Sequence, residues 1–524
     1  MKIFRVGILI LCALAMVAAP LLLSAPTHTP IVRANPITPI PTSGFINEDI
    51  YLNDDFPVMN ITMHEGHYLQ RYDWGHMADI SITGTSSQFE FTNQIAEIRG
   101  RGNSTWRVMG DKRPIRIRFP HETDCMIHLG GGGNGRAMFD SEYAFRNWVL
   151  MAHVVDPSFM RNRAAFDLAR QMGTMCFVPN SWFVHMYLNG EYRGVFELAD
   201  RVERRTGRIE LNNSTTQRNP HNQEYLLHMS RHPRGVADTP AGSDWFLVGR
   251  QRFEIQHPED DKIYLGSPFN AYVIDFVNRV DSAINSGDED RIRDMIDIPS
   301  FVDVYIVDEF LKNRDSGFSS EWYTIRGRGD TRRLHAGPVW DFDQAAGSTM
   351  HFLRGSYGSP WQLWSANQNL WFNRLMRQRW FYDEVATRWA HVSAHYISNT
   401  LAMIDYMGTR FAGDTYTGFG RNFARWPEHL LEAPWRIHSR VSPAMHGITT
   451  FDGHVEFLSD WLTQRDAFMT YFLTDGFYLL FQTSVWWFAL LIIIPGAVLL
   501  MCIVLISIAR ARNRRARISH GSST

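Results

Sequence analysis

Two aspartates separated by one residue stand in an otherwise apolar stretch of the chain. Asp341 and Asp343 belong to GPVWDFDQAAG (337–347), beside Trp340 and Phe342. On a β-strand, residues two apart point to the same side, so this spacing predicts convergent carboxylates. Such a pair is costly in apolar surroundings unless a cation balances it. A divalent metal that carries nucleotide phosphates would do so, and a helix cap or an ion pair with a nearby arginine is the structural alternative.

Basic residues gather in two neighbouring segments. IRGRGNSTW (98–106) contains Arg101 and two glycines, which allow close backbone approach to a ligand. RPIRIRF (113–119) alternates apolar and basic residues, which predicts a strand with Arg116 and Arg118 on one face. Guanidinium groups bind phosphate oxygens well, so these arginines are candidate phosphate ligands. For 98–106, a tight turn with solvated arginines is an equally good interpretation.

Polar residues also follow an apolar helical pattern. The segment FLKNRDSG (310–317) places Asn313 and Asp315 directly after that pattern ends. These two residues complete the set of candidate chemical groups.

Several elements must position these groups. A helical pattern over 160–172 stops at Gly173, and Asn189 with Gly190 predicts a hairpin within 181–198. A strand-rich first half and a helix-rich second half predict an α+β, two-lobed body. Further helices are expected over 271–284, 299–311, 371–389 and 455–472.

The composition sets broader limits. The chain has 524 residues, of which 45% are hydrophobic and 20% charged, with a formal net charge of −2. These values exclude a disordered or collagen-like chain and give no reason to expect a nucleic-acid partner. Cys125 and Cys176 could form one disulfide bond in an oxidising compartment, and no cysteine spacing indicates zinc.

Apolar residues are concentrated at the two ends. Residues 1–25 have the charge-then-apolar order of a signal peptide or uncleaved anchor, and 26–50 are a proline-containing linker. Residues 484–509 are apolar enough for a transmembrane helix, and 510–524 carry five arginines, which predicts a cytoplasmic tail. The sequence thus predicts a single-pass membrane protein whose main domain, 51–473, is extracytoplasmic.

Six motifs occur in this order along the chain: IRGRGNSTW, KRPIRIRF, DPSFMRNRAAFDLARQMG, YLNGEYRGVFEL, NRDS and GPVWDFD. Together they resemble the spore coat protein H (CotH) kinase family. The resemblance covers about 56–472 and implies a bilobal, atypical, secretory-kinase-like fold. It also implies binding of ATP with Mg²⁺ and phosphorylation of Ser or Thr in proteins.

The resemblance assigns roles residue by residue. Asp315 resembles the catalytic aspartate that orients the acceptor hydroxyl and accepts its proton. Asp341 resembles a metal-holding aspartate of the DFG type, with Asp343 as a second contact, a division that suits phosphoryl transfer. Asn313 is expected beside the cofactor, and the arginines that the residue pattern itself suggests as phosphate ligands, Arg101, Arg116 and Arg118, fit the same assignment.

The chain departs from the family pattern at two points. Family members often have a lysine where this chain has Arg118, and Lys112 is a nearby substitute outside the alternating strand. An exchange of Lys for Arg is not automatically conservative. After GVFEL the usual Glu is absent, and Asp200 or Glu203 could replace it.

The sequence supports one leading function and two alternatives. The leading one is a membrane-anchored CotH-type kinase acting on Ser or Thr of a surface or spore-coat protein, in a compartment that supplies ATP. The second is a non-catalytic surface adhesin or coat-assembly scaffold with a pseudokinase-like domain. Carbohydrate hydrolysis by the paired acids ranks third, because acids two residues apart are an unusual way to flank a glycosidic bond.

Overall fold

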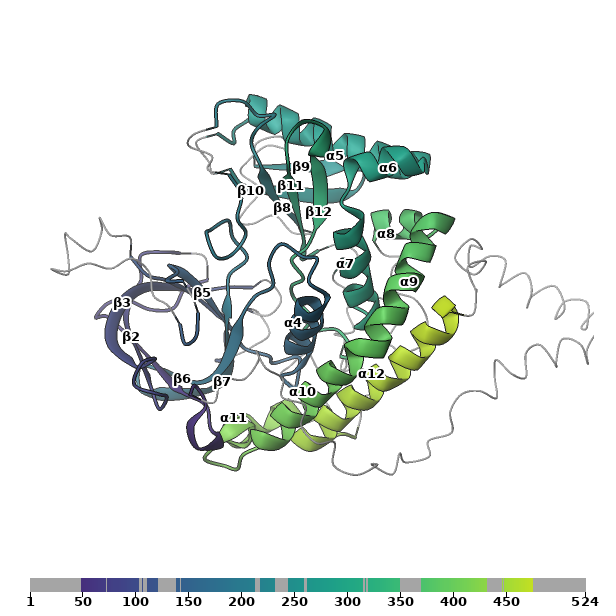
Figure 1. Ribbon diagram of the computed structural model, residues 1–524. Helices are drawn as coiled ribbons and strands as arrows, with labels where there is room; N and C mark the ends of the chain where they lie inside the picture. Colours follow the sequence, from purple (N-terminus) through teal and green to yellow (C-terminus); the bar gives the residue numbers. More distant parts are fainter. Residues whose placement is uncertain are drawn as a thin grey trace, which may run out of the picture. The chain divides into compact units, whose positions relative to one another are not determined.

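The structure is a computed structural model, drawn in Figure 1. The chain divides into units 1–41 and 42–524, and every described residue belongs to the second unit. The described residues are 49–71, 73–102, 106, 111–120, 138–141, 143–212, 217–230, 244–258, 262–313, 316, 319–348, 369–430, 445 and 447–474.

The first part of this unit is a closed β-barrel with strand order β1-β2-β3-β4-β5-β7-β6. Neighbouring strands are antiparallel except β1 and β6, which close the barrel as a parallel pair. The strands are β1 (Val58–Met63), β2 (Met77–Thr83), β3 (Phe91–Gly100), β4 (Ile115–Arg118), β5 (Asn147–Met151), β6 (Ser181–Leu188) and β7 (Glu191–Asp200).

Two sequence predictions about the barrel are confirmed. In β4, Ile115 and Ile117 are fully buried while Arg116 and Arg118 are half-exposed, as the alternating pattern requires. In the turn between β6 and β7, the backbone φ angle is 52° at Asn189 and 77° at the following glycine. Positive φ at both central residues is the geometry that makes Asn-Gly a preferred hairpin turn.

A second, five-stranded antiparallel sheet has the order β12-β11-β8-β10-β9. On one face, the ring of Phe253 lies 5.4 Å from Trp371 and 6.1 Å from Tyr323, so this face is part of the apolar core. The strands are β8 (Tyr225–Ser230), β9 (Trp245–Val248), β10 (Gln251–His257), β11 (Glu321–Arg326) and β12 (Arg333–Ala336).

Helices pack around these sheets, and α7, α9 and α12 run side by side (Figure 1). Helix α4 ends at Gly173, which adopts the left-handed conformation with φ 78°, as predicted. Asp297 caps α7 by accepting a hydrogen bond from the Ser300 amide. The helices are α4 (Arg161–Met172), α5 (Pro268–Ser286), α6 (Glu289–Met295), α7 (Ile298–Phe310), α8 (Leu370–Leu375), α9 (Arg379–His395), α10 (Ile397–Arg410), α11 (Gly418–Arg425) and α12 (Phe451–Thr474).

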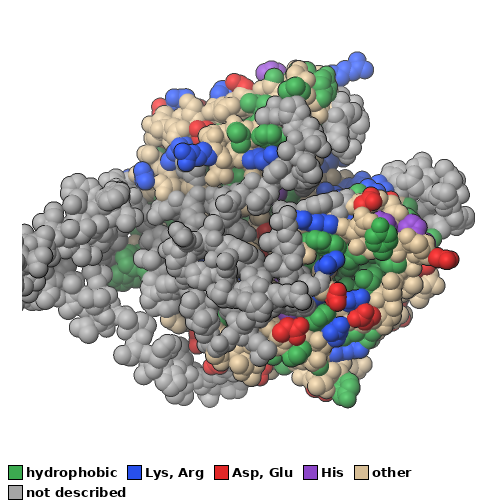
Figure 2. All heavy atoms as spheres, turned by 180° about the vertical axis from the view of Figure 1, so that it is seen from behind, with side chains coloured by type: hydrophobic (Ala, Val, Ile, Leu, Met, Phe, Trp, Pro, Cys, Tyr) green, Lys and Arg blue, Asp and Glu red, His purple; other side chains and the backbone are tan. Residues whose placement is uncertain are grey.

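On the face shown in Figure 2, acidic and basic side chains of the described residues are interspersed with apolar ones. Some exposed charges pair along a helix, as Arg379 and Asp383 do at 2.8 Å. Such exposed pairs contribute less than about 1 kcal/mol each, so the stability of the fold rests mainly on the buried core.

The predicted two-lobed kinase architecture is wrong for this chain. The structure instead has a closed seven-stranded barrel and a separate five-stranded sheet, in which helices α5, α6 and α7 lie between β10 and β11 in the chain. The second sheet was missed because its strands are four to seven residues long, and because the pairing of β8 with β11, which joins its two parts, links residues far apart in the chain. Barrel closure was missed for the same reason, since the partners β1 and β6 are far apart in sequence.

The expected single-pass membrane localisation is also corrected. Within the part of the chain that the structure describes, no helix combines the length and the apolar character needed to cross a membrane. The segments on which the expectation rested, 1–25, 484–509 and 510–524, lie outside the described residues, as does the linker up to residue 48.

Candidate functional site

The two aspartates of the apolar segment lie on a loop, not on a strand. Strand β12 ends at Ala336, and the loop of residues 337–348 follows it. Asp341 has φ 71° and Ala346 has φ 43°, both in the left-handed region that non-glycine residues rarely adopt. The prediction that a strand aims both carboxylates the same way is therefore wrong. The conformation of the loop, and not a strand, determines where the carboxylates of Asp341 and Asp343 lie.

Arg101 lies close enough to both carboxylates to interact with them electrostatically. Burial lowers the pKa of Arg101, while Asp341 and Asp343 act to raise it. Its guanidinium carbon also lies 5.8 Å from the centre of the Trp340 ring. Arg101, one of the three arginines predicted to bind phosphate, therefore lies beside Trp340 of the two-aspartate loop.

Ser320 is a site residue that sequence reasoning missed. Its hydroxyl donates a hydrogen bond to Oδ2 of Asp341 at 2.7 Å. Ser320 directly precedes β11, which is the sheet neighbour of β12. The sequence carried no signal for this contact, because the pairing of two strands brings the two residues together.

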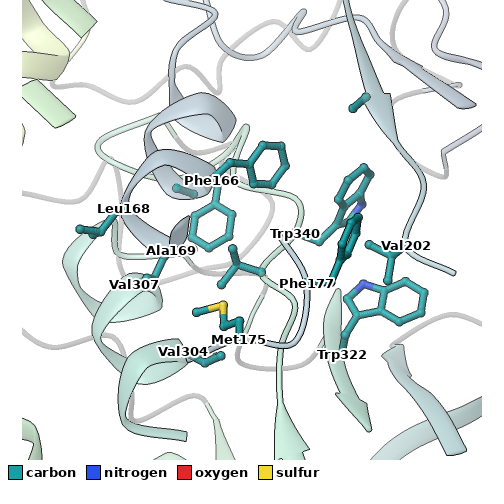
Figure 3. Close-up of a cluster of buried hydrophobic side chains, with 14 of the residues drawn as sticks. Phe166, Leu168, Ala169, Met175, Phe177, Val202, Val304, Val307, Trp322 and Trp340 are labelled. Atoms are coloured by element: carbon teal, nitrogen blue, oxygen red, sulfur yellow. The ribbon is translucent and has the colours of Figure 1, made fainter. Parts of the chain in front are cut away.

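Apolar packing fixes the start of the loop. Figure 3 shows Trp340 beside Phe177, Val202 and Trp322, with Phe166 of α4 on its other side. The rings of Trp340 and Phe166 stack with their centres 5.9 Å apart. Because this cluster is buried, the residue before Asp341 has little freedom to move.

The donor set fits a magnesium ion that carries phosphates. Mg²⁺ is commonly held by one or two carboxylates, with phosphate oxygens and waters completing its shell. Asp341 and Asp343 could supply the carboxylates, and Arg101 a cation for phosphate oxygens. A closed protein-only metal site is a different case: the described residues contain no cluster of three or more His, Cys, Asp or Glu side chains that could hold an ion.

Arg116 and Arg118 lie in a separate cluster around Trp74. Their guanidinium carbons are 5.6 and 4.2 Å from the centre of the Trp74 ring, and that of Arg99 is 4.5 Å from it. Arg118 also forms an ion pair with Glu97, its cross-strand neighbour on β3. The structure therefore gives each of these arginines a partner within the barrel.

Gly100 makes room for an aromatic ring rather than for a ligand. A Cβ atom at this position would overlap the side chain of Trp106. The guanidinium of Arg113 lies 4.5 Å from the centre of the same ring. The close approach predicted for this glycine exists, and the group that approaches is part of the protein.

Lys112, the possible substitute for the family lysine, is fully buried. Its ammonium group donates to the carbonyl oxygen of Ala152 at 2.6 Å and lies 4.7 and 5.0 Å from the rings of Phe159 and Phe196. Burial lowers the pKa of Lys112 well below its usual value. These contacts place it in the interior, away from the basic face of β4.

Asn313 is buried beside the end of α7. Its side-chain amide donates to Oδ1 of Asp308 at 3.3 Å, and its backbone amide donates to the Asp308 carbonyl. The Ser316 hydroxyl donates to the Asn313 carbonyl at 2.9 Å, and the Asn369 amide donates to the Ser316 carbonyl at 3.2 Å. Asp315, the predicted catalytic residue, lies outside the described residues. Asn313 and Ser316, on either side of it in sequence, are both held by hydrogen bonds.

A buried carboxyl pair lies behind this turn and was also missed. Asp308 and Glu321 are both almost inaccessible to solvent. Burial raises the pKa of both, and the hydrogen bond and repulsion between them raise that of Glu321 further. The apolar pattern of α7 gave no sign of it, since Glu321 comes from β11.

The two acids proposed to replace the family glutamate are joined by one arginine. Arg208 lies 2.8 Å from Asp200 and 2.6 Å from Glu203. Glu203 also accepts a hydrogen bond from Asn147, the cross-strand neighbour of Arg118. The arginine, the two acids and Asn147 therefore form one hydrogen-bonded network at the end of the barrel.

The predicted disulfide bond involves a residue that the structure does not describe. Of the two predicted cysteine partners, Cys176 is half-buried and Cys125 lies outside the described residues.

The chain matches a model of a known protein family. A family model described as CotH kinase protein matches residues 98–469, which covers most of the chain. The matched region includes the basic strand, the turn after α7 and the two-aspartate loop. No curated protein matches the chain.

Proposed function

The chain belongs to the CotH kinase family, and from this premise we propose that it transfers the γ-phosphoryl group of Mg-ATP to Ser or Thr hydroxyls of a protein. A surface or spore-coat protein is the acceptor that we propose. The observation that carries the proposal is the position of Arg101 beside the two-aspartate loop: its guanidinium carbon lies 5.8 Å from the centre of the ring of Trp340, directly before Asp341, and Asp341 and Asp343 influence its pKa.

Each residue has a distinct part in this proposal. Asp341 and Asp343 hold the metal ion, and the hydroxyl of Ser320 fixes the orientation of Asp341. Arg101 neutralises charge on the phosphate oxygens. Asp315 takes its role from the family motif, orienting the acceptor hydroxyl and accepting its proton.

This division of labour suits phosphoryl transfer. Because the transition state has little covalent chemistry for the protein to perform, positioning and charge neutralisation dominate. Mg-ATP supplies the phosphoryl group and the divalent charge when bound. The protein supplies carboxylates on a loop that is fixed by packing, and a cation within reach of both.

A transfer assay with the purified full chain tests the proposal. Radiolabelled ATP and Mg²⁺ are supplied with a serine-rich test protein, and label on the chain itself or on the test protein is measured. We expect Asp315→Asn to reduce label transfer by at least about 100-fold, since general acid–base groups contribute this much or more. Asp341→Asn should remove the dependence on Mg²⁺ together with the activity.

The control is Asp275→Asn, an equally small change at an exposed residue of α5. Asp275 pairs only with Arg279 along the helix among the described contacts, so its loss should leave transfer unchanged. Absence of label with the wild-type chain, or label that survives both site substitutions, would refute the proposal.

A non-catalytic scaffold is the second candidate, and one observation favours it. Arg118, which stands where the family often has its lysine, is paired with Glu97 and stacked on Trp74. An arginine engaged in this way has less capacity to bind phosphate than a free lysine would have.

Nucleotide binding separates the two candidates. A Mg²⁺-dependent rise of the melting temperature with ATP supports the kinase. No shift with ATP, combined with a shift produced by a coat protein or polysaccharide, supports the scaffold.

A further inference from the structure

Arg161, at the start of α4, is fully buried, and its side chain contacts the backbone of the two-aspartate loop. Its Nε donates to the Ala345 carbonyl at 2.9 Å, and its Nη2 donates to the Ala346 carbonyl at 3.1 Å. These carbonyls lie two and three residues after Asp343. One guanidinium group therefore holds two consecutive peptide units of the loop.

The other side of the same guanidinium is fixed by a tight turn. Nη1 of Arg161 donates to Asp156 and, at 3.0 Å, to the Ser158 hydroxyl. Asp156 in turn accepts from the Arg161 backbone amide at 3.0 Å and from the Ser158 hydroxyl at 2.6 Å. Although burial acts to raise the pKa of Asp156, Arg161 holds it below its usual value. The Arg161 side chain is thus held by Asp156 and Ser158 on one side while it contacts the loop on the other.

Asn162, the next residue, holds the same loop at a second point. Its side-chain oxygen accepts a hydrogen bond from the backbone amide of Phe342 at 2.6 Å, and Phe342 stands between the two aspartates. A third contact is made at the end of the loop, where the hydroxyl of Ser348, the residue after Gly347, donates to the Val155 carbonyl at 2.6 Å.

The loop needs these contacts because two of its residues are strained. Asp341 at φ 71° and Ala346 at φ 43° have left-handed backbone conformations, which are uncommon for non-glycine residues and less favourable for alanine than for aspartate. The contacts from α4 lie next to these residues: Asn162 holds Phe342, which follows Asp341, and Arg161 holds Ala345 and Ala346.

We propose that Arg161 and Asn162 are positioning residues, which hold the loop so that the carboxylates of Asp341 and Asp343 converge on one metal ion. This inference rests on the proposed function for the identity of the metal-nucleotide ligand. The positioning itself is a property of the chain and can be measured without any ligand.

Hydrogen–deuterium exchange of the full chain tests the positioning directly. Asn162→Ala removes the acceptor of the Phe342 amide, so peptides covering 341–348 should exchange about tenfold faster, the effect of losing one buried hydrogen bond. Arg161→Lys keeps the charge but loses the fork that spans two carbonyls, and should accelerate exchange of the same peptides.

The matched control is Arg163→Lys. Arg163 lies on the same helix and is equally buried, but its guanidinium contacts Ser181 of the barrel. This variant should accelerate exchange around 181 and leave 341–348 unchanged. If Arg161→Lys does not fold, the comparison of Asn162→Ala with Arg163→Lys decides the matter.

A second readout connects positioning with function. In the transfer assay, Asn162→Ala should raise the Mg²⁺ concentration for half-maximal activity by 10-fold or more, as residues that orient metal ligands commonly do, while activity at saturating Mg²⁺ falls much less. Unchanged exchange over 341–348 overturns the positioning role. Changed exchange with an inactive wild-type chain overturns the proposed function and leaves the positioning role supported.

Discussion

The hydroxyl of Ser320 lies 2.7 Å from Oδ2 of Asp341. This contact joins the start of β11 to a candidate metal ligand on the loop after β12. The second sheet therefore takes part in building the site, although the predicted two-lobed architecture had no place for that sheet.

Ser320→Ala should weaken metal binding more than it weakens the fold. Removing one hydrogen bond costs about 1 kcal/mol of unfolding free energy. It also frees the Asp341 carboxylate to rotate, so the Mg²⁺ concentration for half-maximal activity should rise several-fold. Denaturant unfolding and a Mg²⁺ titration measure the two effects.

Ser393→Ala is the matched control for that change. Its hydroxyl donates to Asp466 at 2.6 Å between α9 and α12, away from the loop. It should lose similar stability with no change in the Mg²⁺ requirement. Equal Mg²⁺ responses of the two variants would contradict the role assigned to Ser320.

The Asp308 and Glu321 pair should make stability fall as pH rises. Burial raises the pKa of both groups in the folded chain above the unfolded values near 4. Above about pH 4 the unfolded state therefore binds fewer protons than the folded state, and the contribution of the pair to stability declines until the folded pKa values are passed.

Asp308→Asn isolates this effect, because the amide oxygen can still accept from Asn313. The difference in unfolding free energy between the variant and the wild type should shift in favour of the variant as pH rises from about 4 to about 8, as measured by urea titrations at several pH values. Parallel pH profiles would show that the pair does not titrate in this range.

Arg118 separates the kinase from the scaffold. If Arg118 contacts phosphate, Arg118→Ala should lower ATP affinity about tenfold, as expected for one charge-assisted hydrogen bond, while Arg118→Lys should retain most of it. Thermal shifts with Mg-ATP measure both. An affinity that is the same in all three proteins would show that the arginine only supports the barrel through Glu97 and Trp74.

Lys112→Met should leave nucleotide binding unchanged, because Lys112 is enclosed by apolar rings and contacts the Ala152 carbonyl. The wild-type pKa is lowered by burial, so from the folded pKa up to the usual lysine value the wild type gains stability as pH rises. The variant should lack that gain. A loss of the Mg-ATP thermal shift in Lys112→Met would instead identify Lys112 as a phosphate ligand.

Local pattern was sufficient for much of the secondary structure and for the family. The alternation of Ile115 and Ile117 with arginines, the Asn-Gly turn at 189, and the helix that ends at Gly173 all depend on neighbours within a few residues. Ordered motifs were enough to identify the CotH kinase family, which the family match confirms.

Tertiary structure decided which candidate groups meet. Arg101, Arg116 and Arg118 are equivalent in residue type, yet only Arg101 has an interaction with Asp341 and Asp343 among the described contacts, while the other two surround Trp74. Ser320 and Glu321 had no recognisable signal, and the motif that contains Arg161 did not indicate its contact with the loop, because each of the three acts on a residue distant in sequence.

The sequence by itself determined the helix and hairpin patterns, the family and the chemical types available at the site. Barrel closure, the second sheet and the loop geometry of Asp341 came only from the folded chain. The physical reason is that strand pairing and buried hydrogen bonds join residues far apart in the chain, and local patterns carry no information about which distant partner satisfies each polar group.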